Sequence, residues 1–230
     1  MNLFLLHENA IKAALVHCDK HCVKMILETC QILYTAWHVN RPDDFFFVKV
    51  NQKPKMLAPL AKIIKDLKQA DDLRLFDNDP CPYKPYKCTH KNHPSAKWVR
   101  AHKAHYDWAI ELGLSLCAEY TRRYGKTHKC QLHLDRLSLM GFPKPEKDID
   151  SGTLPPLEKR AFVGVPDGCE YFDCAINDEV FEKCAVRDKQ GRLNGVETYR
   201  NYYGTKKTDK WTLMWNKGKD DEPEWYIPTF

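Results

Sequence analysis

The sequence lacks any hydrophobic run long enough to cross a membrane as a helix. Its longest apolar stretches, Leu3 to Leu6 and Phe45 to Val48, are far shorter than the ~20 residues that a transmembrane helix needs. No basic region precedes the apolar patch near the N-terminus, so a secretion signal is not expected. Internal repeats and low-complexity tracts are also missing. We therefore expect a protein of the cytoplasm that does not enter membranes.

Paired C-x-x-C motifs, which hold structural zinc, are absent although the chain has ten cysteines. Most of these cysteines are expected to act as small buried hydrophobic residues in a reducing compartment. One cluster of metal-capable side chains stands at helical spacing, formed by His17, Cys18, His21 and Cys22. No second group of ligands accompanies this cluster. We therefore expect neither a metal nor a cofactor.

A strong excess of one charge is also missing. The chain has 36 Lys and Arg against 31 Asp and Glu, a net charge of +5 and a pI near 8.6. This balance permits a nucleic-acid partner without requiring one, because a strongly basic footprint has a pI above ~9. The length of 230 residues and the 43% of hydrophobic residues suit a globular fold with a real core.

Apolar periodicity and the placement of proline and glycine predict a mainly α fold. We expect helices over Ala10–Trp37, Leu57–Ala70 and Pro94–Tyr124, and a short one over Asp178–Ala185. We expect extended chain at Met1–Leu6 and Phe45–Val50, and irregular structure at Asp77–His93 and Gly141–Gly195. The last segment, from Val196 onward, is dominated by Tyr and Trp with interleaved lysines. Gly125 stops the third helix. The prediction is a single compact domain over residues 1–230, built on two long helices with irregular loops and a short N-terminal extended segment.

Polar residues recur at steps of three and four along the first predicted helix, and so form one stripe. The stripe consists of His17, His21, Lys24, Glu28, Gln31, Thr35 and His38. One interpretation is a solvent-facing surface with an ordinary ion pair between Lys24 and Glu28. The other is a cleft in which His21, Lys24 and Glu28 handle charge. Periodicity does not decide between them.

Two later segments concentrate positive charge. The first runs from Lys84 through His93 into the next helix, where Lys91, His93, Lys97 and Arg100 surround backbone amides that favour a phosphate. The second, Tyr199–Lys207, mixes aromatic rings with cations, a combination that stacks on bases and holds phosphates. The alternatives are a solvated basic surface for the first segment and rings packed on the core for the second.

Three motifs occur in order along the chain. Asp19-Lys-His21 is followed seven residues later by Glu28, the helix after His93 ends in Tyr120-Thr-Arg-Arg-Tyr-Gly125, and the last motif is Tyr199-Arg-Asn-Tyr-Tyr-Gly-Thr-Lys206. Together they resemble the pyrimidine dimer DNA glycosylases, the family of phage endonuclease V. The regions without a match are expected to be insertions, at about 43–92 and 141–195. The resemblance also suggests a phage protein in the cytoplasm of an infected cell.

The resemblance implies a small, mainly helical enzyme of DNA repair or modification, which acts on a damaged or modified pyrimidine in duplex DNA. An N-terminal amine would attack the sugar C1′ of a flipped nucleotide, the base would leave, and a Schiff base would allow strand cleavage by AP-lyase chemistry. Asn2 is too large for the usual removal of the initiator methionine, so the amine would be that of Met1. Glu28 would be the catalytic carboxylate and His21 a phosphate or sugar contact. Lys24 is an alternative nucleophile if a cleft lowers its pKa.

The residues expected to contact DNA lie in all three motifs and in the basic segment. They are Asp19, Lys20, Gln31, Lys91, His93, Lys97, Arg100, Tyr199, Arg200, Tyr202, Tyr203 and Lys206. Two other functions stay open at this point. One is a nucleic-acid-binding module without catalysis, and the other is an enzyme that processes free nucleotides or nucleosides on the same fold.

Overall fold

The computed structural model describes residues 2–42, 75, 78–145, 160–165, 169–208, 213–217 and 222–226. The strand predicted at Phe45–Val50 and the helix predicted at Leu57–Ala70 lie outside these residues. The predicted mainly α fold is confirmed, because helices make up most of the described secondary structure. The single domain and its two insertions stay predictions.

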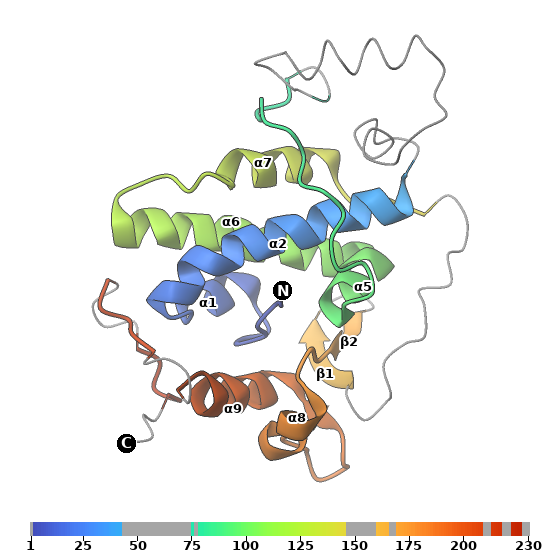
Figure 1. The fold of residues 1–230 in the computed structure, drawn as a ribbon. Helices are drawn as coiled ribbons and strands as arrows, with labels where there is room; N and C mark the ends of the chain where they lie inside the picture. The colour runs from blue at the N-terminus through green and yellow to red at the C-terminus, as the bar shows by residue number, and fades with distance from the viewer. Residues whose placement is uncertain are drawn as a thin grey trace.

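Two 22-residue helices, α2 (Asp19–Asn40) and α6 (Lys103–Tyr124), pack against each other at the centre of the molecule (Figure 1). Their buried residues form one core with those of the N-terminal segment and of the C-terminal elements. At Gly113 of α6, a Cβ atom would lie 2.9 Å from the Leu134 side chain and 3.3 Å from that of Thr29. The glycine therefore allows three helices to approach closely at this point.

The single helix predicted over Ala10–Trp37 is wrong, because the structure divides it into α1 (Ala10–Leu15) and α2. Neither Gly nor Pro marks the break. Arg123 donates from Nη2 to the carbonyl of Leu15 (3.0 Å) and from Nη1 to that of His17 (2.8 Å). The break therefore depends on a residue of α6, distant in sequence, that satisfies the carbonyl groups at the end of α1.

The helix predicted over Pro94–Tyr124 is likewise two helices, α5 (Pro94–Ala101) and α6. His102 has extended backbone between them, and its side chain accepts a hydrogen bond from the Ala104 amide as the N-cap of α6. The predicted stop at Gly125 is confirmed, with φ of 63° and its amide bonded to the Thr121 carbonyl (2.8 Å).

The C-terminal half is more regular than predicted. It holds α7 (Gln131–Met140), β1 (Arg160–Val165), β2 (Cys169–Asp173), α8 (Asp178–Cys184), β3 (Leu193–Asn194) and α9 (Gly195–Thr208). The irregular structure predicted at Gly141–Gly195 is therefore wrong where the strands lie, whereas the predicted short helix is confirmed as α8. The sheet order is β2-β1-β3, with β1 antiparallel to β2 and parallel to β3.

The aromatic segment from Val196 onward, for which no regular element was predicted, begins within helix α9. Tyr199 and Tyr203, one turn apart, are both fully buried and turn one face of α9 toward the core. The loop predicted at Asp77–His93 is confirmed over residues 78–93, which form neither helix nor strand.

The N-terminal segment Leu3–Leu6 lies between α2 and α9 and is almost entirely buried (Figure 1). Arg200 of α9 donates from Nε to the Leu6 carbonyl at 3.1 Å. The start of the chain is therefore held by the C-terminal elements. In the described part of the chain, no helix is both long and apolar enough to cross a membrane.

Candidate active site

The carboxylate of Glu28 lies on α2 between a lysine and the start of the chain. Its Oε1 is 3.0 Å from Lys24 Nζ, and its Oε2 accepts a hydrogen bond of 2.8 Å from the backbone amide of Asn2. The Glu28 side chain is 12% exposed, whereas that of Lys24 is 52% exposed. The carboxylate is thus partly removed from water but still accessible, which strengthens its interaction with a nearby positive charge.

Asn2 is held by three separate parts of the molecule. Its Nδ2 donates to the Ala175 carbonyl at 3.2 Å, and its Oδ1 accepts from Ser95 Oγ at 3.4 Å and from the Tyr199 hydroxyl at 3.3 Å. The Asn2 nitrogen, which carries the peptide bond to Met1, is therefore held beside Glu28.

His93 is the N-cap of α5, beside the same carboxylate. It accepts a hydrogen bond from the Ser95 amide at 3.3 Å. Burial lowers the pKa of His93 to about 4, with further lowering by the N-terminal amine and by His90, against an opposing effect of Glu28. The ring is therefore neutral at pH 7, as an acceptor at a helix start should be. The site thus joins α2, the chain start and α5.

A family model described as pyrimidine dimer DNA glycosylase matches residues 1–132. This span exceeds half of the 230 residues and contains Asn2, Glu28, His93 and Ser95. The chain belongs to the pyrimidine dimer DNA glycosylase family. Neither the curated proteins nor the solved structures yield a match to it. The family supports DNA glycosylase activity and DNA as the substrate.

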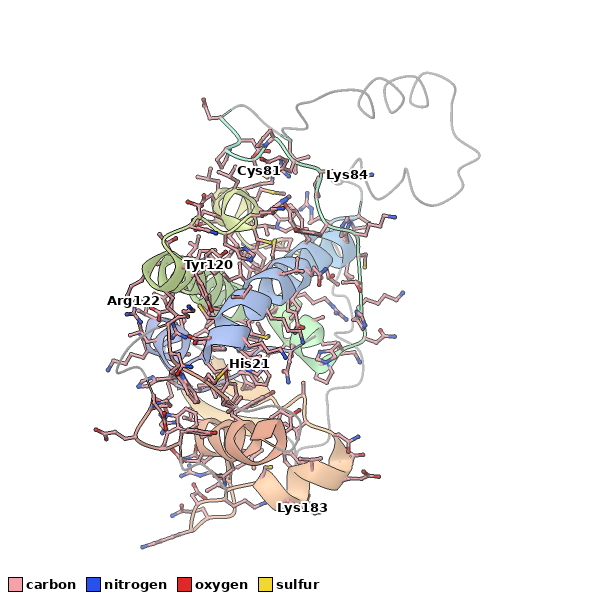
Figure 2. All side chains as sticks on the ribbon, turned by 60° about the vertical axis from the view of Figure 1, so that its left-hand side comes forward. His21, Cys81, Lys84, Tyr120, Arg122 and Lys183 are labelled. Atoms are coloured by element: carbon pink, nitrogen blue, oxygen red, sulfur yellow. The ribbon has the colours of Figure 1, made fainter. Side chains whose placement is uncertain are left out.

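In this glycosylase His21 lies inside the protein rather than at the surface. Figure 2 labels it on the turn of α2 that faces α9, and it is fully buried. The Tyr203 hydroxyl accepts from the Cys18 amide at 3.0 Å and lies 2.7 Å from His21 Nδ1. The Tyr203 hydroxyl therefore connects the start of α2 to the His21 ring. The contact to phosphate or sugar stays a prediction.

Asp19, the first residue of the D-x-H motif, connects the start of α2 to the end of α6. Its Oδ1 pairs with Arg123 Nη1 at 3.0 Å, and its Oδ2 accepts from the Lys217 amide at 3.1 Å. Its backbone carbonyl accepts from the Tyr124 hydroxyl at 3.2 Å. Asp19 thus connects α2 to the end of α6 and to the segment 213–217, while the adjacent Lys20 is exposed.

The polar stripe reaches solvent only in its middle. At its start His17 and His21 are fully buried, whereas Lys24 is exposed and Gln31 is half-buried. In the second half, the loop before α5 covers the stripe: Thr35 Oγ1 donates to the Thr89 carbonyl at 3.1 Å, and His38 Nε2 lies 2.8 Å from the Tyr86 carbonyl. The stripe is therefore buried at both ends and open to solvent between Lys24 and Gln31.

The basic segment is open along its loop and closed where α5 begins. Lys84, labelled in Figure 2, is exposed, as is Lys91, whereas Lys97 is half-buried. Arg100 is buried and donates from its guanidinium to the Lys91 carbonyl. The exposed lysines of this loop remain the candidates for phosphate contacts, and Arg100 instead shapes the loop.

The aromatic motif of α9 lies largely in the core. Tyr199 and Tyr203 are fully buried and Tyr202 is half-buried. The Arg200 guanidinium lies 5.4 Å from the centre of the Trp225 ring and bonds to Glu197 at 2.8 Å. Lys206 belongs to α9, but its side chain lies outside the described part. The structure therefore favours packing over base stacking for the two buried rings.

Sequence reasoning missed Asn2 and Ser95 as members of the site. Both are short polar residues without a motif of their own, and their contact joins positions that are 93 residues apart. The only hint in the sequence was the expected role of the N-terminal amine, which implied that the start of the chain lies close to Glu28. In the described residues, no group of three or more His, Cys, Asp or Glu side chains is arranged to hold a metal ion.

A buried histidine between α1 and α2 gives a pH prediction. Burial lowers the pKa of His17 to about 4, against a hydrogen bond from Nδ1 to the Ala13 carbonyl at 2.6 Å. Nε2 of His17 has no hydrogen-bond partner among the described residues. In the unfolded chain His17 is protonated below pH ~6.5, whereas in the folded chain it is protonated only below pH ~4. The free energy of unfolding therefore falls as the pH is lowered from ~6.5 to ~4.

We expect the free energy of unfolding to fall between pH 7 and pH 4 by on the order of 3 kcal/mol more in the wild type than in His17→Leu. Urea unfolding at a series of pH values measures both curves. Parallel curves for the two proteins would contradict the prediction.

Proposed function

We propose that this glycosylase cleaves the N-glycosidic bond of a damaged or modified pyrimidine in DNA, with its N-terminal amine as nucleophile and Glu28 as the catalytic carboxylate. The observation that carries the proposal is the 2.8 Å hydrogen bond from the Asn2 amide to Glu28 Oε2. It ties the first peptide group of the chain to a carboxylate that solvent still reaches. Asn2, held in this way, differs from the second residue of most chains, which is poorly ordered.

In the proposed reaction the lone pair of the amine attacks C1′, and the electrons of the glycosidic bond leave with the base, which takes up a proton. The bond from C1′ to the ring oxygen then opens to give an imine between C1′ and the amine. Loss of a proton from C2′ and cleavage of the C3′–O bond release the 3′ phosphate, which completes the lyase step. An α-amine suits this role because its ordinary pKa, near 8, leaves a useful unprotonated fraction at neutral pH.

Glu28 has two tasks in this scheme. Its negative charge stabilises the positive charge that develops on the sugar as the base departs, and its position beside the amine lets it accept the proton released on attack. Lys24 Nζ, 3.0 Å from Oε1, forms an ion pair with the carboxylate and holds it in place.

The surface around the site suits a DNA strand. Lys20 and Lys24 on α2 and Lys84, Lys87 and Lys91 on the neighbouring loop are exposed. Such lysines neutralise phosphates and offset the few kcal/mol that extrusion of a nucleotide costs. We propose these exposed lysines, rather than Arg100 or the buried tyrosines, as the principal phosphate contacts.

Borohydride trapping tests the proposal. The full-length protein is mixed with duplexes that carry UV photoproducts, abasic sites or modified pyrimidines, and borohydride reduces any imine to a stable amine. We expect a covalent adduct, and peptide mapping by mass spectrometry to locate it at the Met1 amine. The duplex that gives the adduct identifies the base.

Each other outcome removes part of the proposal. An adduct on the peptide that contains Lys24 would transfer the nucleophile to that residue. Base release without an adduct would mean hydrolysis assisted by Glu28. Absence of both would favour the binding module or the enzyme of free nucleotides.

A further inference from the structure

Residues beyond the end of the family match form hydrogen bonds to the side chain of Asn2. The match ends at residue 132, whereas Ala175 and Tyr199 both bond to the Asn2 side chain. We infer that Tyr199 is a positioning residue of the glycosylase, whose hydroxyl fixes Asn2 and thereby holds the N-terminal amine against Glu28. This inference rests on the proposed function, because it assumes that the amine is the nucleophile.

Two hydrogen bonds fix the position of the Tyr199 hydroxyl. It accepts a hydrogen bond from the Ala175 amide at 2.9 Å and donates to Asn2 Oδ1 at 3.3 Å. Asn2 Nδ2 in turn donates to the Ala175 carbonyl at 3.2 Å. Asn2, Ala175 and Tyr199 therefore form a closed set of three hydrogen bonds, so a movement of Asn2 breaks more than one of them.

The Tyr199 ring is also fixed on several sides. It is fully buried, with its centre 5.6 Å from that of Phe172 on β2 and 6.1 Å from that of Phe4 in the N-terminal segment. The hydroxyl of a ring packed in this way has a fixed position, since a buried tyrosine has little rotamer freedom. A second bond, from Ser95 Oγ to Asn2 Oδ1, supports the same point from α5.

The chemistry makes this fixation useful. A flexible terminus samples many positions, and attack on C1′ needs the amine within about 3.5 Å of the carbon in the right direction. The Asn2 contacts remove most of that freedom before DNA binds. A small displacement costs rate in the chemical step and leaves affinity for DNA unchanged, because Tyr199 itself has no exposed surface.

The test compares Tyr199→Phe with the wild type in single-turnover trapping on an abasic-site duplex. The substitution removes only the hydroxyl. We expect imine formation at saturating DNA to slow by about tenfold, while the DNA concentration for half-saturation changes by less than twofold. We also expect Asn2→Leu, which is again too large for removal of Met1, to slow the reaction at least as much, because it removes the contacts to Tyr199, Ala175 and Ser95 together. The double variant should show no further loss beyond Asn2→Leu, because the contact between Asn2 and Tyr199 is already broken.

Tyr106→Phe is the matched control. Tyr106 is also fully buried, and its hydroxyl also accepts one bond and donates another, from Trp37 Nε1 and to the Leu137 carbonyl, both at 3.1 Å. A general loss of stability would slow trapping equally in both Phe variants, and that result would overturn the positioning role. If Tyr199→Phe does not fold, Ser95→Ala replaces it, with the same expected loss at saturating DNA.

The remaining outcomes separate this inference from the proposed function. Trapping by the wild type at Met1, together with an unchanged rate in Tyr199→Phe, would overturn the positioning role alone. A wild-type protein that gives no adduct at its amine would overturn the proposed nucleophile, and the role of Tyr199 with it.

Discussion

Replacement of Glu28 by Gln is expected to slow base release by at least about 10²-fold while the protein still folds and binds DNA. The amide keeps the size of the carboxylate, and its carbonyl oxygen can still accept the bond from the Asn2 amide. What is lost is the negative charge. Removal of one preorganised electrostatic group of this kind costs roughly 10²–10³ in rate in other enzymes.

The loss is expected in the chemical step rather than in binding. Glu28 is 12% exposed and would repel a phosphate, so its neutralisation leaves DNA affinity equal or slightly higher. Single-turnover base release and borohydride trapping measure the rate, and fluorescence anisotropy measures the dissociation constant. The trapped adduct should decline in parallel with base release, because both follow from attack on C1′.

Glu111→Gln is a suitable control for this prediction. Glu111 is an exposed glutamate on α6 and belongs to neither the site nor its contacts. The same substitution there should leave the rate of base release unchanged. If Glu28→Gln keeps its turnover, Glu28 is not the catalytic carboxylate, and that part of the proposed function is overturned.

The position of Glu28 could be predicted from the sequence because its signal is local. Residues three and four apart on a helix share a face, so the pair of Lys24 and Glu28 follows from spacing alone. The two long helices also follow from local periodicity, and the stop at Gly125 from its need for a left-handed conformation.

The break after α1 and the contact between Tyr199 and Asn2 were missed because they depend on contacts between distant residues. The break after α1 needs Arg123 to bond to the His17 carbonyl across 106 positions, and the contact between Tyr199 and Asn2 spans 197 positions. A cation-rich aromatic segment such as the one at Tyr199 has the same composition whether its rings stack on bases or pack in a core. The tertiary structure decides between these two roles, and here it buries the rings of Tyr199 and Tyr203.

Replacement of Arg123 by Ala is expected to lower the free energy of unfolding by about 3–5 kcal/mol, the range for a broken buried ion pair. Its side chain is fully buried and donates to Glu119, to Asp19 and to the carbonyls of Leu15 and His17. Burial alone would raise the pKa of Glu119, but hydrogen bonds from Arg122 and Arg123 hold it below its usual range.

The neighbouring Arg122 tests whether burial is the reason. It also pairs with Glu119, but its own side chain is 49% exposed, so Arg122→Ala should cost less than about 1 kcal/mol. Urea unfolding of the two variants measures both costs. Equal small losses would mean that the guanidinium of Arg123 does not hold the junction of α1 and α2. A large loss in Arg123→Ala alone would show that the fold depends on the ion pairs of Arg123 with Glu119 and Asp19. Because Asp19 begins α2, these ion pairs would also hold the start of the helix that carries Glu28.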